Sequence, residues 1–248
     1  MTTSLEGVLA GKVALVSGSS RGMGKAIAVA FARNGASVAV TARTASALDD
    51  VVAEIRNLGA DAIAVPADLE DTEGLPRIVE AVISNFGRLD ILVNNAGLIK
   101  PFKDLVDFTP DEWRKTIEVN LVAPAMLTRA VLPTMISQQA GRIINISSMG
   151  GRRGKKGRTA YAASKAGLIN LTESIAAEVK KHGIDVVCIC PNATDTEGMR
   201  EAFPDASFAA MRPDEIANLA VFLASDSSSA IAGSAIDAFG VSNPIFND

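Results

Sequence analysis

The clearest sign of the fold is the stretch Lys12-Val-Ala-Leu-Val-Ser-Gly18-Ser-Ser-Arg-Gly22-Met-Gly24. It predicts an apolar strand over 12–17, a glycine-rich turn, and a helix over 22–34. Glycines permit a tight turn and close approach of the backbone to a ligand, while a helix N-terminus offers free N–H groups to phosphate. The stretch therefore indicates a dinucleotide pyrophosphate site, with a ligand-free turn as the alternative.

The rest of the chain continues this alternation of strand and helix. Strands are expected over 37–41, 62–66, 91–93, 142–147, 185–190 and 235–238, and helices over 46–58, 75–86, 160–182 and 213–224. The segment 110–139 predicts about two helical pieces around Pro124 and Pro133. Such alternation favours an α/β fold, a doubly wound parallel sheet with helices on both faces. We find no linker or repeat, so we expect one domain over residues 1–248.

Composition excludes several classes of protein. A net charge of −4 provides no general basic field for nucleic acid. We identify no apolar run long enough for a bilayer and no signal-peptide pattern at the start, so we expect a cytoplasmic protein without a membrane partner. Cys188 and Cys190 lie two apart in an apolar strand, which favours buried thiols over a disulfide or metal pair. His182 is the only histidine, and we expect no metal.

The end of the second strand indicates which dinucleotide binds. A carboxylate there would bind the adenosine ribose 2′-hydroxyl and repel a 2′-phosphate. The run Val38-Ala-Val-Thr-Ala-Arg43-Thr44 has no acid, and Arg21 lies in the glycine turn. Two guanidinium groups suit a phosphate, so the sequence predicts a preference for NADP(H). The alternative is that both arginines are solvated surface residues.

Tyr161 and Lys165 lie four residues apart, on one face of the helix predicted there. A nearby ammonium group favours the phenolate and is expected to lower the pKa of Tyr161 towards a useful acid–base range. Ser148 precedes the tyrosine by thirteen residues. The spacing of Tyr161 and Lys165 is weak evidence alone, and its weight comes from the motifs around it.

Together these motifs resemble those of the short-chain dehydrogenase/reductase family. The matching elements, in the usual order, are Gly18-x-x-x-Gly22-x-Gly24, Asn94-Asn95-Ala96-Gly97, Asn120, Ser148 and Tyr161-x-x-x-Lys165. The resemblance runs from about residue 9 to 240 and points to the 3-oxoacyl-reductase-like branch. It implies a single-domain Rossmann fold that transfers hydride between a nicotinamide and a carbonyl or alcohol carbon, without metal.

The resemblance also implies individual roles. Tyr161 is the general acid in reduction, Lys165 lowers its pKa and binds the nicotinamide ribose, and Ser148 polarises the substrate oxygen. Asn120 supports a water that links the lysine to solvent, or is merely structural. Asp68 would accept the adenine amino group, or cap a helix. The implied cofactor-binding residues are Gly18, Ser20, Arg21, Gly22, Met23, Gly24, Arg43, Asp68, Leu69, Asn95, Ala96, Gly97, Tyr161, Lys165, Pro191, Asn192, Thr194 and Thr196.

Three departures from the family pattern bear on turnover and substrate. Asn192 replaces a usual glycine after the sixth strand, which questions the turn beside the nicotinamide. A short substrate lid is expected over 197–212, whose apolar members either line the substrate site or pack as core: Met199, Phe203, Phe208 and Met211. A basic loop either recruits an anionic substrate or is simply solvated: Arg152, Arg153, Lys155, Lys156 and Arg158.

The leading hypothesis is an NADPH-dependent carbonyl reductase acting on a small carbonyl substrate. The alternatives are an alcohol dehydrogenase in the oxidative direction and a non-catalytic NADP-binding regulator. The family's carrier-protein docking arginines would correspond to Gln139 and His182, so docking of an acidic carrier looks weakened. The resemblance further implies a homo-oligomer, a dimer or tetramer, with small residues on the helix of Tyr161 permitting close contact.

Overall fold

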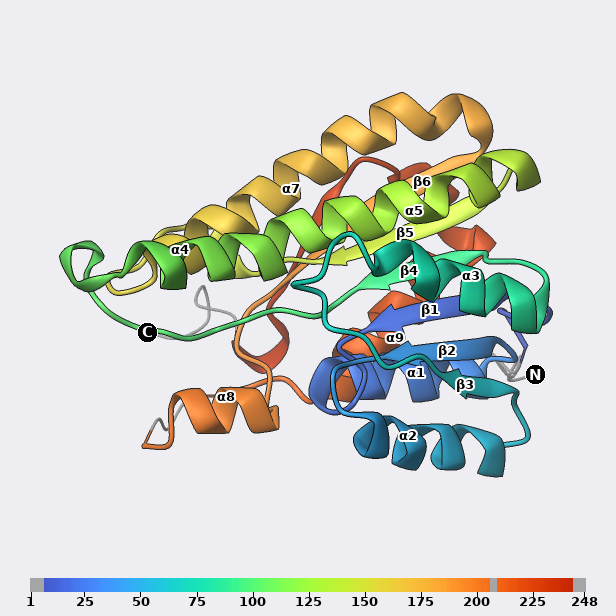
Figure 1. Cartoon of the computed structure of the whole chain (residues 1–248), viewed down its shortest axis with the longest axis horizontal. Coiled ribbons are helices and arrows are strands. Elements are labelled where there is room, and N and C mark those ends of the chain that lie inside the picture. The colour runs from blue at the N-terminus through green and yellow to red at the C-terminus, as the bar shows by residue number, and fades with distance from the viewer. Residues whose placement is uncertain (1–6, 206–208, 243–248) are drawn as a thin grey trace.

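Seven parallel strands form one sheet in the order β3-β2-β1-β4-β5-β6-β7 (Figure 1). The computed structural model describes residues 7–205 and 209–242. The strands are β1 Val13–Ser17, β2 Ser37–Thr41, β3 Ala62–Ala64, β4 Ile91–Asn94, β5 Gly141–Ile146, β6 Ile184–Pro191 and β7 Ala235–Ala238. Because β1 pairs with both β2 and β4, the strand order reverses beside β1, and ligands of open α/β sheets bind at such a point.

Helices cover both faces of the sheet, as the alternation of elements predicts. The first face carries α1 Gly22–Arg33, α2 Ala45–Asn57 and α9 Pro213–Ala224. The second carries α3 Leu75–Phe86, α5 Ala123–Gln138 and α7 Thr159–Val179 (Figure 1). Short helices are α4 Pro110–Ile117, α6 Met149–Arg152 and α8 Glu197–Ala202, with 3₁₀ turns at Leu105–Asp107, Lys180–His182, Asp226–Ile231 and Gly240–Ser242.

Two apolar layers hold this arrangement together. Phe31 and Ile27 of α1 are fully buried with Val38 on one side of the sheet. On the other side, Leu127 of α5 is buried with Leu92 of β4. Strands covered on both faces are apolar throughout, which is why β1 and β4 lack an alternating polar pattern. The doubly wound fold is confirmed.

The segment expected to hold about two helical pieces around Pro124 and Pro133 does hold two, α4 and α5, joined in one continuous helical path. A π-turn over Glu118–Val122 joins α4 to α5. Pro124 falls in the first turn of α5, where a missing N–H is tolerated best. Pro133 lies inside α5, and burial of Val131 and Met135 beside it offsets the lost hydrogen bond. The expectation of two helical pieces is therefore confirmed, with their junction just before Pro124.

The same segment corrects the expectation that no apolar run is long enough to cross a bilayer. The helical path Pro110–Gln138 spans 29 residues and satisfies a membrane span by length and composition. Core helices of globular domains meet the same criterion, and α5 packs Leu127 and Val131 against the sheet. The third expected strand also ends early, at Ala64, although the Val65 N–H still donates to the Val40 carbonyl oxygen at 2.9 Å.

Candidate active site

Two of the three glycines of the first turn, Gly18 and Gly24, fit against the loop that follows β4. Gly18 has φ of +63°, and a Cβ there would lie 2.7 Å from the Cα of Ala96. A Cβ on Gly24 would lie 2.3 Å from the carbonyl oxygen of Gly18 and 2.4 Å from Nδ2 of Asn95. Side chains at these positions would push the turn open. The resulting bare backbone at the start of α1 is a cradle that fits a pyrophosphate.

Asn95 and Ser17 join the two strand ends that flank this cradle. Nδ2 of Asn95 donates to the carbonyl oxygens of Ser17 and Gly18, at 2.9 and 3.1 Å. Oγ of Ser17 accepts from the backbone N–H groups of Asn95 and Ala96, at 3.0 and 3.2 Å. Asn94 lies deeper, where its Nδ2 donates to Oδ1 of Asn145 at 2.8 Å. Asn94 thus joins β4 to β5, and Asn95 positions the loop.

Lys165 is buried, with 4% of its surface exposed, and its Nζ donates to the carbonyl oxygen of Ile146 at 2.8 Å. Desolvation lowers the pKa of this ammonium group to about 8, against opposing contributions from Cys188 and Cys190. Both cysteines are free and buried, as expected for strand thiols. The ammonium group is thus held on the backbone at the end of β5.

Tyr161 lies beside Ser148, at the mouth of the same strand ends. Burial is the largest influence and raises the pKa of Tyr161, whereas a hydrogen bond with Ser148 and the charge of Arg158 lower it. The expectation that Lys165 lowers this pKa is therefore wrong for this arrangement, because that ammonium group binds the Ile146 carbonyl instead. Ser148 is also the N-cap of α6, where its Oγ accepts from the N–H of Gly150 at 3.0 Å.

The π-turn places Asn120 beside Lys165. Oδ1 of Asn120 accepts from the N–H of Leu98 at 2.7 Å, and Nδ2 donates to the Leu98 carbonyl at 2.9 Å and to Oγ of Ser164 at 3.1 Å. A Cβ on Gly97 would lie 3.3 Å from both Oδ1 of Asn120 and Nζ of Lys165. Asn120 therefore holds the loop after β4 in place through the Leu98 backbone. This structural role does not depend on any role in proton transfer.

The two arginines predicted to bind a 2′-phosphate differ in their surroundings. Arg21 forms a bidentate ion pair with Glu201 of α8, a contact that the sequence did not suggest. Lys100 also reaches α8, where its Nζ donates to the Glu201 carbonyl at 2.7 Å. Arg43 is exposed and has no ion pair or hydrogen bond within the part of the chain that the structure describes. Arg43 is thus available to an incoming anion, and Arg21 is already paired.

The segment after β6 resolves the question raised by Asn192. Its φ is outside the left-handed region, so no glycine is required there. Nδ2 of Asn192 donates to the Ser242 carbonyl at 2.7 Å. Thr194 is buried, and Oγ1 of Thr196 caps α8 by accepting from the N–H of Met199 at 3.2 Å. The turn therefore survives the substitution.

Other predicted residues have mixed outcomes. Asp68 accepts from the N–H of Glu70 at 3.1 Å, in a turn rather than as the cap of α3, and Leu69 is buried in the core. Among the expected lid residues, Met211 is buried with the core of α9, and Phe208 lies outside the described residues. Within 7–205 and 209–242, no cluster of three His, Cys, Asp or Glu side chains could hold a metal.

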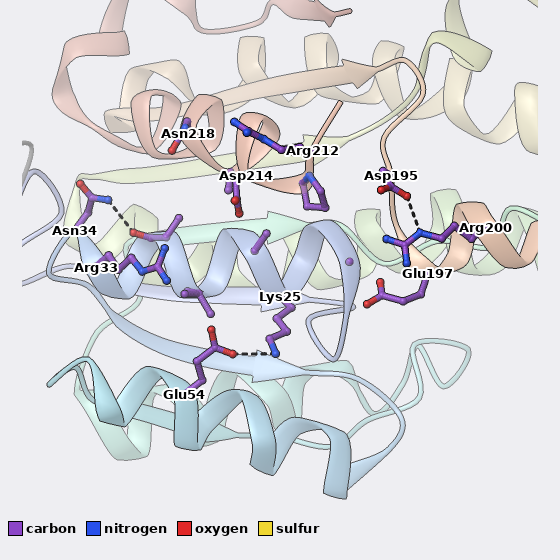
Figure 2. Close-up of a pocket in the computed structure, with 16 residues that line it drawn as sticks. Lys25, Arg33, Asn34, Glu54, Asp195, Glu197, Arg200, Arg212, Asp214 and Asn218 are labelled. Atoms are coloured by element: carbon purple, nitrogen blue, oxygen red, sulfur yellow. Dashed lines mark hydrogen bonds and ion pairs between the residues drawn. The ribbon is translucent and has the colours of Figure 1, made fainter. Parts of the chain in front are cut away.

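A hollow of about 760 Å³ opens beside the glycine turn, between α1, α9 and α8 (Figure 2). Gly22 lies at its edge, and its walls carry the ion pairs Lys25–Glu54, at 2.9 Å, and Arg200–Asp195, at 2.7 Å. Neither Tyr161 nor Ser148 lines it. The hollow therefore belongs to the outer flank of the cradle and not to the reacting groups.

Comparisons with known proteins agree with this geometry. Residues 12–207 match the model of the short chain dehydrogenase family. The chain is 38% identical over 229 residues to a 3-oxoacyl-[acyl-carrier-protein] reductase of Synechocystis sp., covering 90% of this chain and 92% of the relative.

Two solved structures share the fold. One, provisionally described as an NAD(P)-dependent gluconate 5-dehydrogenase of Beutenbergia cavernae with bound NADP, is 34% identical with a TM-score of 0.87, over 94% of this chain and 96% of that one. The other is carveol dehydrogenase of Mycobacterium avium with NAD, 28% identical with a TM-score of 0.88, over 93% and 97%. The glycine cradle, the strand-end residues and these matches together show that the chain belongs to the short-chain dehydrogenase family and uses NAD(P)(H).

Proposed function

We propose that the protein is an NADPH-dependent carbonyl reductase in which Tyr161 donates the proton. The observation that carries this proposal is the pairing of Ser148 and Tyr161 at the strand ends, beside a buried Lys165 and the glycine cradle. The bound cofactor supplies the hydride that the carbonyl carbon accepts. The protein's own residues must then orient and protonate the carbonyl oxygen.

Ser148 and Tyr161 divide this task. The N–H of Gly150 donates to Oγ of Ser148, and the Ser148 hydroxyl hydrogen-bonds Tyr161, so a substrate oxygen would enter between the serine and the phenol and take over the serine's hydrogen bond. Burial raises the pKa of Tyr161, which keeps the phenol protonated near neutral pH and able to give its proton to the forming alkoxide. The pKa of the Lys165 ammonium group, about 8, is close enough to neutral pH for this group to return a proton to Tyr161 after the tyrosine has given up its own.

The preference for NADPH rests on charge at the end of β2. Arg43 is an exposed cation without a partner in the described chain, and no acid stands in the run Val38–Thr44 to repel a 2′-phosphate. Arg21 lies one residue before α1 and becomes a second ligand once Glu201 releases it. One of the two solved relatives holds NADP and the other holds NAD, so this comparison does not distinguish the two dinucleotides. The proposed preference for NADPH therefore rests on Arg43 and Arg21.

The decisive experiment follows oxidation of NADPH against a panel of ketones, with NADH in parallel. Turnover is expected with NADPH and is expected to vanish in Tyr161→Phe, while the exposed α7 control Ser174→Ala retains it. Binding of NADPH, measured by the fluorescence of the reduced nicotinamide, should be retained in all three proteins. Equal turnover by wild type and Tyr161→Phe would contradict the proposed acid.

A second candidate is the same chemistry in the oxidative direction. It is favoured by the relative named carveol dehydrogenase, whose structure holds NAD. Faster turnover of secondary alcohols with NADP⁺ than of the matching ketones with NADPH, at equal saturation, would support it. A regulator that binds NADPH without turnover is the remaining class, and loss of all activity despite tight binding would favour that class.

Assembly and location are also proposals. Ala163, Ala166 and Asn170 are exposed small residues along α7, which suits close helix contact between copies in a dimer or tetramer. Gly167 is explained within the chain, because a Cβ there would lie 2.8 Å from Cδ2 of Leu121. Sedimentation showing only monomer would contradict assembly. The unpaired thiols Cys188 and Cys190 suit a reducing compartment such as the cytoplasm.

A further inference from the structure

Arg158 lies in an aromatic setting beside the reacting groups. Its guanidinium carbon is 4.9 Å from the ring centre of Phe102 and 4.8 Å from that of Phe203. The same carbon is 5.8 Å from the ring centre of Tyr161. Phe102 comes from the loop after β4, Phe203 from the end of α8, and Arg158 from the residue before α7. Three segments thus converge on one cation at the mouth of the site.

Three of the cations near Arg158 are paired with carboxylates, whereas Arg158 is not. Arg152 pairs with Asp237 at 2.9 Å, Lys103 with Glu112 at 2.7 Å, and Lys156 approaches Asp104 at 3.4 Å. Within the described chain, the Arg158 guanidinium has neither an ion pair nor a hydrogen-bond acceptor, although its side chain is half-buried. Unsatisfied donors of a partly desolvated cation are unfavourable unless a ligand supplies the acceptors.

The two phenylalanine rings lie on the same side of the guanidinium group, because their own centres are only 4.8 Å apart. A guanidinium group carries five N–H donors, and aromatic rings do not satisfy them as an oxygen acceptor does. The donors on the side away from Phe102 and Phe203 therefore suit a planar, bidentate acceptor. A carboxylate has that geometry. The short separation from Tyr161 means that such a carboxylate would belong to the same small molecule as the carbonyl that Tyr161 protonates.

We infer that Arg158 binds the carboxylate of an oxo-acid substrate, which makes it a specificity-determining residue. The inference rests on the proposed reductase function and narrows its substrate class. A free oxo acid carries this negative charge close to its ketone, whereas an acyl thioester of a carrier has none at that position. Phe102 and Phe203 would then exclude water around the ion pair and strengthen it.

The kinetic test compares a free acid with its neutral ester. Rates of NADPH oxidation with 3-oxobutanoate and with methyl 3-oxobutanoate are measured for wild type, Arg158→Gln and Arg158→Lys. The control is Arg153→Gln, an exposed arginine of the same loop. Loss of a charged hydrogen bond is expected to lower kcat/KM for the acid about ten- to hundredfold in Arg158→Gln. The ester should change by less than about threefold, and Arg158→Lys should recover only part of the loss.

A binding test separates this inference from the proposed function. Calorimetric titration of butanoate onto the protein saturated with NADPH needs no turnover. Its Kd is expected to rise about tenfold or more in Arg158→Gln and to stay unchanged in Arg153→Gln. Equal Kd values in wild type and Arg158→Gln would overturn the inference even if ketones are reduced. An Arg158-dependent Kd without reduction of any ketone would uphold the subsite and reject the reductase.

Equal loss for the acid and the ester in Arg158→Gln would also overturn the inference. In that case Arg158 acts by lowering the pKa of Tyr161, and the pH profile of ester reduction would shift towards higher pH. A profile that is unchanged for the ester, together with a selective loss for the acid, identifies a substrate contact. Circular dichroism of each variant establishes that the fold is retained.

Discussion

Replacing Lys165 by methionine is expected to make the protein more stable while abolishing its activity. The ammonium group is buried and, among residues 7–205 and 209–242, has a single hydrogen bond, to the Ile146 carbonyl. Desolvation lowers its pKa from 10.5 to about 8. Methionine keeps the length and the apolar stem without the charge, so the substitution removes the desolvation penalty directly.

The size of the effect follows from linkage between proton binding and folding. Below pH 8 both states carry the ammonium, and the folded state bears the full penalty, on the order of 3 kcal/mol near pH 7. Loss of the hydrogen bond to the Ile146 carbonyl costs about 1 kcal/mol. Lys165→Met should therefore raise the free energy of unfolding by about 2 kcal/mol near pH 7.

The pH dependence has a definite sign. As pH rises from 8 towards 10.5, the folded state loses its proton before the unfolded state does, so the penalty fades. Near pH 9.5 it should fall to about half its value at neutral pH, which removes most of the variant's advantage.

Urea unfolding followed by circular dichroism, at equal protein concentration, measures both values, with the exposed Lys155→Met as control. A variant less stable than wild type at pH 7, or a difference that does not change with pH, would show that the buried ammonium group of Lys165 carries no such desolvation penalty.

Three further changes test the cofactor cradle. Gly24→Ala forces a Cβ to within 2.4 Å of neighbouring atoms, so it should lower the free energy of unfolding by about 1–3 kcal/mol and weaken NADPH binding. The control Gly154→Ala adds a Cβ in open space and should change neither quantity. Urea unfolding and nicotinamide fluorescence measure the two effects. Glu201→Gln releases Arg21 from an exposed ion pair and should tighten NADPH binding about two- to fivefold without affecting NADH; weaker NADPH binding would contradict this. Arg43→Ala should raise the Kd of NADPH about tenfold and leave that of NADH unchanged, and parallel titrations decide it.

Local patterns predicted the scaffold because they depend on neighbouring residues. The glycine turn, the end of α1 and the four-residue spacing of Tyr161 and Lys165 are all properties of short stretches. The parallel sheet follows from the alternation of such stretches. The strand-end position of Ser148 also follows, because β5 is apolar and ends two residues earlier.

These local patterns could not predict contacts between residues that lie far apart in the sequence. The Arg21–Glu201 pair joins residues 180 positions apart, and no local signal links them. The sequence shows the basic loop as a cluster, but only the fold distinguishes Arg158, which lies beside aromatic rings, from Arg152, which is paired with Asp237. The sequence did not predict that the pKa of Tyr161 is raised, for the same reason. That shift depends on burial and on the Lys165 ammonium group, which binds the Ile146 carbonyl.

The π-turn at Glu118–Val122 couples two properties of the helix that contains it. It holds one more residue than an α-helical turn, and a residue in an α-helix accounts for about 100° of rotation. Deleting one residue there would turn α4 about its axis relative to α5, and would move Asn120 off the Leu98 backbone at the same time. A change in chain length at the π-turn therefore cannot alter the rotation of α4 relative to α5 without also displacing Asn120.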